Sequence, residues 1–122
     1  MDFAKIDKAE KKASKELKIL EVFANTELSK KAENYLKEQK YLESINFEIV
    51  LRSNFLKDYP IGYVLSTNSN NIVGFMGTIF SSRNYSDENY IYCNIHTWIV
   101  DKTYRINSFL LLTSLIKKNI TL

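Results

Sequence analysis

Apolar residues near the start of the chain recur at steps of three and four residues. Seven positions follow this spacing: Phe3, Ile6, Ala9, Ala13, Leu17, Leu20 and Ala24. Because Lys and Glu fill the positions between them, the pattern is typical of an amphipathic helix, and we predict helix over residues 2–24. A competing interpretation makes Leu17–Phe23 a short strand, since a short apolar run fits either structure.

Two further helices are predicted before residue 60. Asn25 or Thr26 can serve as the N-cap of the first, and Glu27 suits the positive end of its dipole. Its inner face would carry Leu28, Ala32, Tyr35, Leu36, Gln39 and Leu42. The segment Ile45–Leu56 is the other predicted helix. It ends before Pro60, because a residue that precedes proline is pushed out of the α region.

The pattern changes to that of β-strands from residue 62. Gly62–Thr67 and Ile72–Phe80 are apolar and flank a run of Asn and Ser, which predicts an antiparallel hairpin with a polar turn. Ser81–Asn89 is polar and is predicted to be a loop. Tyr90–Val100 is rich in aromatic and β-branched residues, so we predict one long strand there.

The chain then returns to helical signals. Asp101–Asn107 is predicted to be a loop, and Ser108–Lys118 a helix whose terminal lysines suit the negative end of the dipole. Thr121 and Leu122 resemble the opening of another strand. The predicted fold class is therefore α/β (α+β): N-terminal helices, then a hairpin, a long strand and a helix, in one domain spanning residues 1–122.

Composition narrows the classes of protein that fit. The chain has 122 residues and a net charge of +3, with no cluster of Lys and Arg, so we expect no nucleic-acid partner. The single cysteine, Cys93, excludes an intrachain disulfide and fits a reducing compartment. Charged residues stand where a signal peptide would be apolar, and no apolar run reaches the roughly 20 residues of a membrane span. The expected location is the cytoplasm, with no membrane association.

Three stretches in the second half carry a resemblance to a known family. Pro60–Leu65 and Asn71–Gly77 form a hairpin in which Ile-Val-Gly opens the second strand. Trp98–Arg105 ends a long strand with a hydrophobic-x-Val pattern, a spacer and a Tyr-Arg pair, and Ser108–Lys118 follows as a helix. Over residues 60–122 the chain resembles the GNAT superfamily of acyl-CoA N-acyltransferases, while residues 1–59 match only as a helical lead-in.

The resemblance implies a fold and a departure from it. It implies a GNAT-like hairpin, long strand and CoA-binding helix, without the C-terminal strands that complete the family's groove. Where family members carry R/Q-x-x-G-x-G/A, this chain has Ser108 and Leu110 at the two small positions that follow Arg105. The tyrosine that often protonates the departing thiolate would lie beyond Leu122. We therefore expect a truncated domain that is inactive in isolation.

The resemblance also implies a binding site for acetyl-CoA or another acyl-CoA. Backbone N–H groups at a helix N-terminus and a nearby cation suit a pyrophosphate, and a strand end offers backbone groups to pantetheine amides. The implied cofactor-binding residues are Trp98, Ile99, Val100, Arg105, Ile106, Asn107, Ser108, Phe109 and Leu110. No metal is expected, because one histidine and one cysteine cannot supply a zinc site.

His96, the only histidine, is the candidate general base for the amine, and the alternative is a structural role in a buried strand. Alternation along the strand would place it on the face of Asn94 and Trp98, away from Cys93. Asp87 and Glu88 lie in the loop that is predicted before this strand. Two interpretations are open for them: solvated surface carboxylates, or groups that assist the amine.

The implied function is acetyl transfer from acetyl-CoA to an amine of a small molecule or protein. The alternative is a non-catalytic interaction domain or remnant that binds a protein partner through its charged N-terminal helices. In either case an unmatched sheet edge would favour a homodimer.

Overall fold

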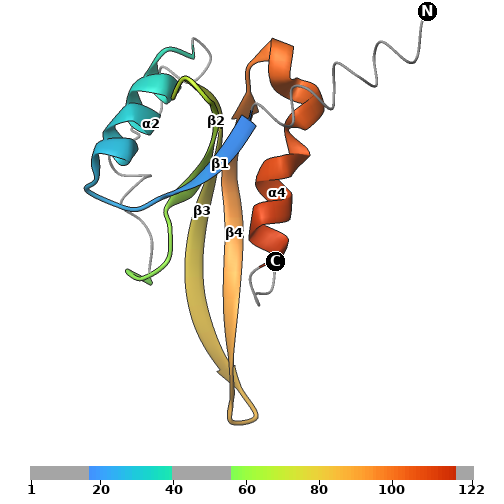
Figure 1. The fold of residues 1–122 in the computed structure, drawn as a ribbon. Helices are drawn as coiled ribbons and strands as arrows, with labels where there is room; N and C mark the ends of the chain where they lie inside the picture. Colours follow the sequence, from blue (N-terminus) through green and yellow to red (C-terminus); the bar gives the residue numbers. More distant parts are fainter. Residues whose placement is uncertain (1–16, 40–55, 118–122) are drawn as a thin grey trace, which may run out of the picture.

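The computed structural model describes residues 17–39 and 56–117, which form an antiparallel sheet with helices on both sides (Figure 1). The sheet has the order β1-β2-β3-β4, and each pair of neighbours is antiparallel. The elements are β1 (Leu17–Val22), α2 (Glu27–Lys37), β2 (Gly62–Thr67), β3 (Ile72–Tyr85), β4 (Glu88–Val100), the 3-10 helix η2 (Lys102–Asn107) and α4 (Phe109–Ile116). The predicted mixed α and β class is confirmed.

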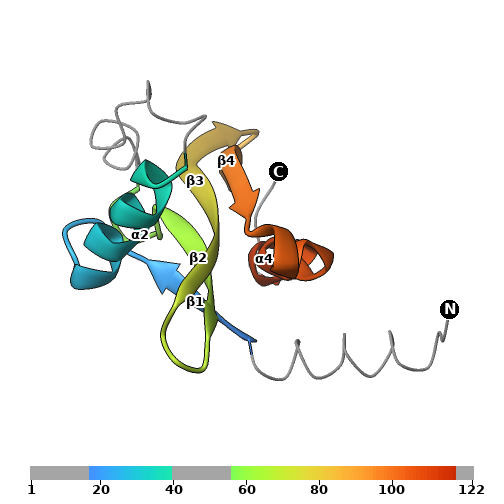
Figure 2. The same ribbon diagram turned by 90° about the horizontal axis from the view of Figure 1, so that it is seen from above.

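The helices lie on opposite faces of the sheet (Figure 2). The α2-side core consists of Val22, Ala32, Tyr35, Leu36, Ile61, Val64, Phe75 and Ile99. The α4-side core consists of Tyr63, Leu65, Val73, Met76, Phe80, Cys93, Val100, Leu111 and Leu115. Each β-strand contributes to both cores because successive side chains point to opposite faces. Gly62–Leu65 of β2 and Ile72–Phe80 of β3, the parts of the central strands that are covered on both faces, are therefore almost continuously apolar.

The prediction of helix over residues 2–24 is wrong for Leu17–Val22, and the competing strand interpretation is confirmed there. All six residues of β1 pair with β2. Leu17 and Ile19 pack on the α4-side core, whereas Leu20 and Val22 pack on the α2-side core. A strand that is covered on both faces lacks a clean apolar–polar alternation, so its spacing resembles that of a helix. Residues 2–16 lie outside the described residues.

The second predicted helix is confirmed as α2. Thr26 is its N-cap: the backbone N–H of Ser29 donates to Thr26 Oγ1 (3.1 Å), and the Thr26 N–H donates to Ser29 Oγ (3.0 Å). This reciprocal pair is a capping box, with Ser29 in place of the more usual Glu or Gln. The helix ends at Lys37, before Gln39. The predicted helix Ile45–Leu56 lies outside the described residues, apart from Leu56.

The predicted strand Gly62–Thr67 is confirmed, but the predicted loop Ser81–Asn89 is wrong. β3 continues to Tyr85, and β4 begins at Glu88. Between them Ser86 and Asp87 have φ of 51° and 66°, as in a two-residue hairpin turn whose twist matches the strands.

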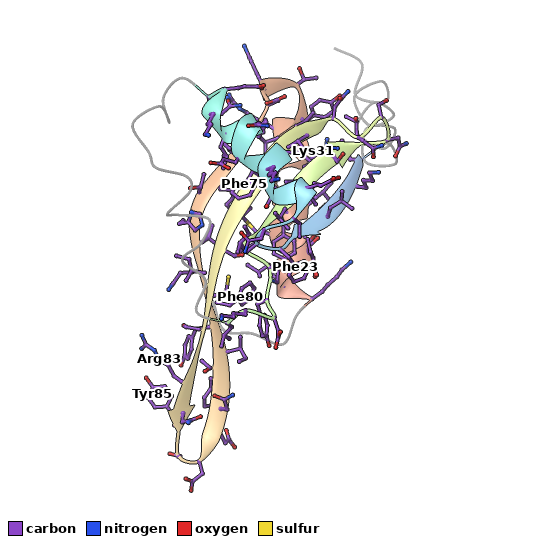
Figure 3. All side chains as sticks on the ribbon, turned by 90° about the vertical axis from the view of Figure 1, so that its left-hand side faces the viewer. Phe23, Lys31, Phe75, Phe80, Arg83 and Tyr85 are labelled. Carbon is purple, nitrogen blue, oxygen red and sulfur yellow. The ribbon has the colours of Figure 1, made fainter. Side chains whose placement is uncertain are left out.

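The distal parts of β3 and β4 form a two-stranded arm that projects beyond the rest of the sheet (Figure 1). Arg83 and Tyr85 lie far along it from Phe75 (Figure 3). Residues 82–90 are exposed, so their polar side chains are compatible with a strand that has solvent on both faces. The guanidinium of Arg83 lies 5.6 Å from the ring centroid of Tyr92 on the opposite strand, and such cross-strand contacts stabilise the arm.

The last two predicted segments differ in detail from the structure. The predicted loop Asp101–Asn107 is largely the 3-10 helix η2, and the predicted helix Ser108–Lys118 is α4 over Phe109–Ile116. Leu111 and Leu115 are fully buried, and they fix α4 on its face of the sheet. Thr121 and Leu122 lie outside the described residues.

Candidate functional site

An open cleft of about 390 Å³ lies where the end of β4 meets η2 and the start of α4. Its volume is in the range of small-molecule sites. The cleft is lined by Trp98, Ile99, Val100, Arg105 and Ser108. All five belong to the predicted acyl-CoA site, so the structure brings together residues from a strand, a 3-10 helix and the residue before α4.

Backbone hydrogen bonds fix the turn of the chain beside this cleft. The N–H of Asp101 donates to the carbonyl of Val73 (2.8 Å), which ties the chain after β4 to the neighbouring strand. The N–H of Tyr104 then donates to the carbonyl of Asp101 (2.8 Å) and begins the reversal into η2. These two bonds fix the direction in which the chain turns from the end of β4 into η2.

β4 is an edge strand of the described sheet. Its inner edge pairs with β3, and no described strand pairs with its other edge. Alternate backbone N–H and C=O groups along that edge are thus open to a ligand or to another strand. At its C-terminal end this open edge adjoins the cleft lined by Trp98, Ile99 and Val100.

Arg105 is the cation of the cleft. Its Nε–H donates to the carbonyl of Val100 at 3.4 Å, which directs the side chain back toward the end of β4. Within the described part of the chain, this carbonyl is the one hydrogen-bond acceptor of the Arg105 side chain. A guanidinium has five N–H donors in a planar fork, so it retains donors suited to a phosphate.

At the start of α4, fewer backbone N–H groups are free to bind a ligand than in an open loop. The N–H of Ser108 donates to the carbonyl of Arg105 (3.1 Å), and the N–H of Leu111 donates to the carbonyl of Ser108 (3.2 Å). The expectation that the backbone N–H groups of residues 106–110 bind the pyrophosphate is therefore wrong for Ser108, whose N–H already donates to Arg105. The Ser108 hydroxyl makes no capping bond, and this residue lines the cleft.

The remaining predicted site residues lie outside the lining of the cleft. Ile106 and Phe109 are exposed, with exposed fractions of 54% and 57%. Asn107 is buried, and Leu110 packs against the α4-side core. Leu110 stands at a position where the resemblance would imply a small residue, and its packing shows that here the position serves the core.

His96 occupies a β-bulge. Gly77 pairs with Thr97 and the next residue, Thr78, pairs with Ile95, so His96 is the extra residue of β4. A bulge places two consecutive side chains on one face and breaks the alternation. The prediction that His96 shares a face with Trp98 is therefore wrong.

The imidazole lies on the α2 side of the sheet. Phe75 belongs to the α2-side core, Gly77 follows it by two residues, and a Cβ on Gly77 would clash with the His96 ring. Nδ1 lies 3.0 Å from Thr97 Oγ1, and Nε2 is buried without a hydrogen-bond partner among residues 17–39 and 56–117. Burial lowers the pKa of His96, because the charged form is poorly solvated there. A neutral imidazole can accept a proton.

The other candidate groups are poorly placed for chemistry in the cleft. Cys93 is buried in the α4-side core, and burial raises the pKa of its thiol to about 11, so it is an unreactive thiol. Asp87 and Glu88 lie at the far end of β4, about 40 Å of strand from Val100 at ~3.3 Å per residue. Neither carboxylate can act on a ligand beside Trp98.

One contact near the site had no signal in the sequence. The hydroxyl of Tyr35, on α2, donates to Asp101 Oδ1 at 2.7 Å, across 66 positions of sequence. Asp101 immediately follows β4 and precedes η2, so this bond joins α2 to the chain that forms the cleft. Tyr35 was predicted only as a member of the inner face of its helix.

Comparisons with protein-family models, with curated proteins and with solved structures found no match. Over residues 17–39 and 56–117, no three His, Cys, Asp or Glu side chains group so that they could hold a metal ion. No helix in those ranges is long and apolar enough to cross a membrane.

Proposed function

We propose that the cleft between β4 and α4 binds acyl-CoA and that the chain is a GNAT-type acyltransferase domain. One observation carries this proposal. An open strand edge, a guanidinium and a hydroxyl converge on a single cleft at Trp98–Val100, Arg105 and Ser108. An acyl-CoA joins an amide-bearing pantetheine to a pyrophosphate. Its amides suit the strand edge, and its phosphates suit the guanidinium and the hydroxyl.

Each part of the ligand has a matching group. The pantetheine amides can hydrogen-bond along the open edge of β4 as an additional strand would. The pyrophosphate can accept charge-assisted hydrogen bonds from Arg105 and a further bond from the Ser108 hydroxyl. The aromatic ring of Trp98 is 43% exposed and offers apolar surface to the pantetheine chain or the adenine.

In the proposed reaction an amine of a small molecule or protein attacks the thioester carbonyl. The new C–N bond forms as the C–S bond breaks, and the electron pair of that bond leaves on the CoA thiolate. His96 is the candidate base for the proton that the amine loses, because its lowered pKa favours the neutral imidazole. It lies two residues before Trp98, on the opposite face of β4 from that side chain.

Calorimetric titration of CoA into the protein tests this proposal. We expect saturable binding, and we expect Arg105→Gln to weaken it about five- to tenfold, because a charge-assisted contact to phosphate is lost. Lys102→Gln is the matched control: it removes a cation from the same 3-10 helix at a residue that does not line the cleft. Equal losses in both variants, or no binding by the unmodified protein, would contradict the proposal.

The second candidate function is a non-catalytic interaction domain, and the projecting arm is the observation that favours it. Tyr85 and Tyr90 expose 52% and 38% of their surface there, on a two-stranded segment that packs on neither helix. Exposed aromatic residues on a projecting hairpin suit contact with a protein partner. A protein that binds no CoA but whose partner binding is lost on removal of the arm would support this function instead.

A further inference from the structure

The contact between Tyr35 and Asp101 fixes a carboxylate directly after Val100, one of the residues that line the proposed acyl-CoA cleft. Tyr35 is 6% exposed and belongs to the α2-side core, so its ring is held by packing. Its hydroxyl donates to Asp101 Oδ1 at 2.7 Å, while the rest of Asp101 is exposed to solvent. A buried tyrosine thus fixes the direction of an otherwise exposed carboxylate.

That carboxylate lies close along the chain to the cation of the cleft. Arg105 follows Asp101 by four residues, and its Nε–H donates to the carbonyl of Val100, the residue that precedes Asp101. Such proximity would favour an Asp–Arg ion pair. Although both residues are described, Asp101 and Arg105 form no ion pair, and the carboxylate is directed to α2. Asp101 is also absent from the lining of the cleft.

We infer that Tyr35 is a positioning residue that holds the Asp101 carboxylate away from Arg105 and so keeps the guanidinium available for an anionic ligand. The inference rests on the proposed function, because the anion in question is the pyrophosphate of an acyl-CoA. Without the Tyr35 hydroxyl, the exposed carboxylate can rotate and pair with Arg105. It then competes with the phosphate for the same N–H donors and adds a repulsive charge near them.

The expected effect is modest, because both partners are exposed to solvent. An ion pair at an exposed site changes an equilibrium by about two- to fivefold. Tyr35→Phe should therefore raise the dissociation constant for CoA by about that factor. The phenylalanine keeps the ring in the core, so packing around α2 is preserved.

The decisive variant is the double substitution Tyr35→Phe with Asp101→Asn. An asparagine carries no charge and cannot compete with phosphate for Arg105. If the tyrosine acts by holding the charge away, the double variant should bind CoA as tightly as the unmodified protein, and Asp101→Asn alone should bind at least as tightly. If the bond only stiffens the turn after β4, the double variant should bind as weakly as Tyr35→Phe.

Calorimetric titration with CoA distinguishes these outcomes. Tyr90→Phe is the matched control: its hydroxyl also donates to a carboxylate, Glu88 (2.6 Å), but on the distant arm, so CoA binding should not change. Weaker binding by Tyr35→Phe that Asp101→Asn restores supports the inference. Unchanged binding by Tyr35→Phe, or weaker binding that Asp101→Asn does not restore, overturns the inference alone. An unmodified protein that binds no CoA overturns the proposed function and the inference together.

Discussion

The imidazole of His96 occupies the space that a side chain on Gly77 would need. Gly77 lies beside the bulge, paired with Thr97, and a Cβ there would meet three atoms of the His96 ring. The glycine is thus required by the close approach of the ring. The bulge explains why the ring lies on the α2 face of the sheet, because it directs the side chains of His96 and Thr97 to the same side.

Gly77→Ala should destabilise the protein by about 1–3 kcal/mol, since overpacking of a well-packed site forces neighbouring groups to move. The free energy of unfolding, from denaturant titration, measures this effect. His96→Ala should remove most of the penalty when it is combined with Gly77→Ala, because the clash is with the ring. A double variant that is as unstable as the sum of the two single variants would contradict the proposed cause.

The pH dependence of stability should report His96. Burial lowers its pKa, so the unfolded chain binds a proton at a higher pH than the folded chain does. The contribution of His96 to stability is therefore present above about pH 6.5, the usual histidine value, and is lost as the pH falls below it. His96→Gln should show a smaller fall in melting temperature between neutral pH and pH 5.

Nuclear magnetic resonance gives the pKa directly, because the chain has one histidine and its ring protons are unambiguous. We expect a midpoint below 6.5. A midpoint at or above 6.5 would mean that Nε2 is hydrated or paired in solution, and His96 would then lose its support as a neutral proton acceptor.

Thr26→Ala should destabilise the protein by about 1 kcal/mol, because it removes the oxygen that accepts from the N–H of Ser29 at the start of α2. Thr26→Ser keeps that oxygen and should cost much less. Denaturant titration of both variants tests the capping box. Equal stability of the alanine and serine variants would show that the cap contributes little.

The sequence predicts secondary structure correctly where the local pattern of apolar and polar residues matches the burial of those residues in the fold. The β2–β3 turn and the start of α2 were predicted from local signals: polar turn residues and a threonine followed by an amphipathic segment. β1 was ambiguous because Leu17–Val22 is covered on both faces, so its apolar positions resemble helical spacing. The polar sequence of Ser81–Asn89 predicts a loop, whereas the structure has a two-stranded arm there, because an isolated pair of strands buries neither face and can be polar on both.

Part of the candidate site can also be predicted from local sequence. Trp98–Val100, Arg105 and Ser108 lie within eleven residues of sequence, so a local resemblance was sufficient to group them. The bulge at His96 could not be predicted, because it depends on the register between β3 and β4. The bond from Tyr35 to Asp101 depends on how α2 packs, and no local pattern encodes a contact across 66 residues.

Fluorescence of Trp98 tests the central claim most directly. Trp98 is the only tryptophan of the chain and it lines the cleft, so a ligand that binds there must change its environment. Excitation at the red edge of the tryptophan band avoids absorption by adenine. We predict a saturable change in emission on titration with CoA, shifted to higher concentrations in Arg105→Gln and unchanged in Lys102→Gln. Emission that does not respond to CoA up to millimolar concentrations would contradict the assignment of this cleft as an acyl-CoA site.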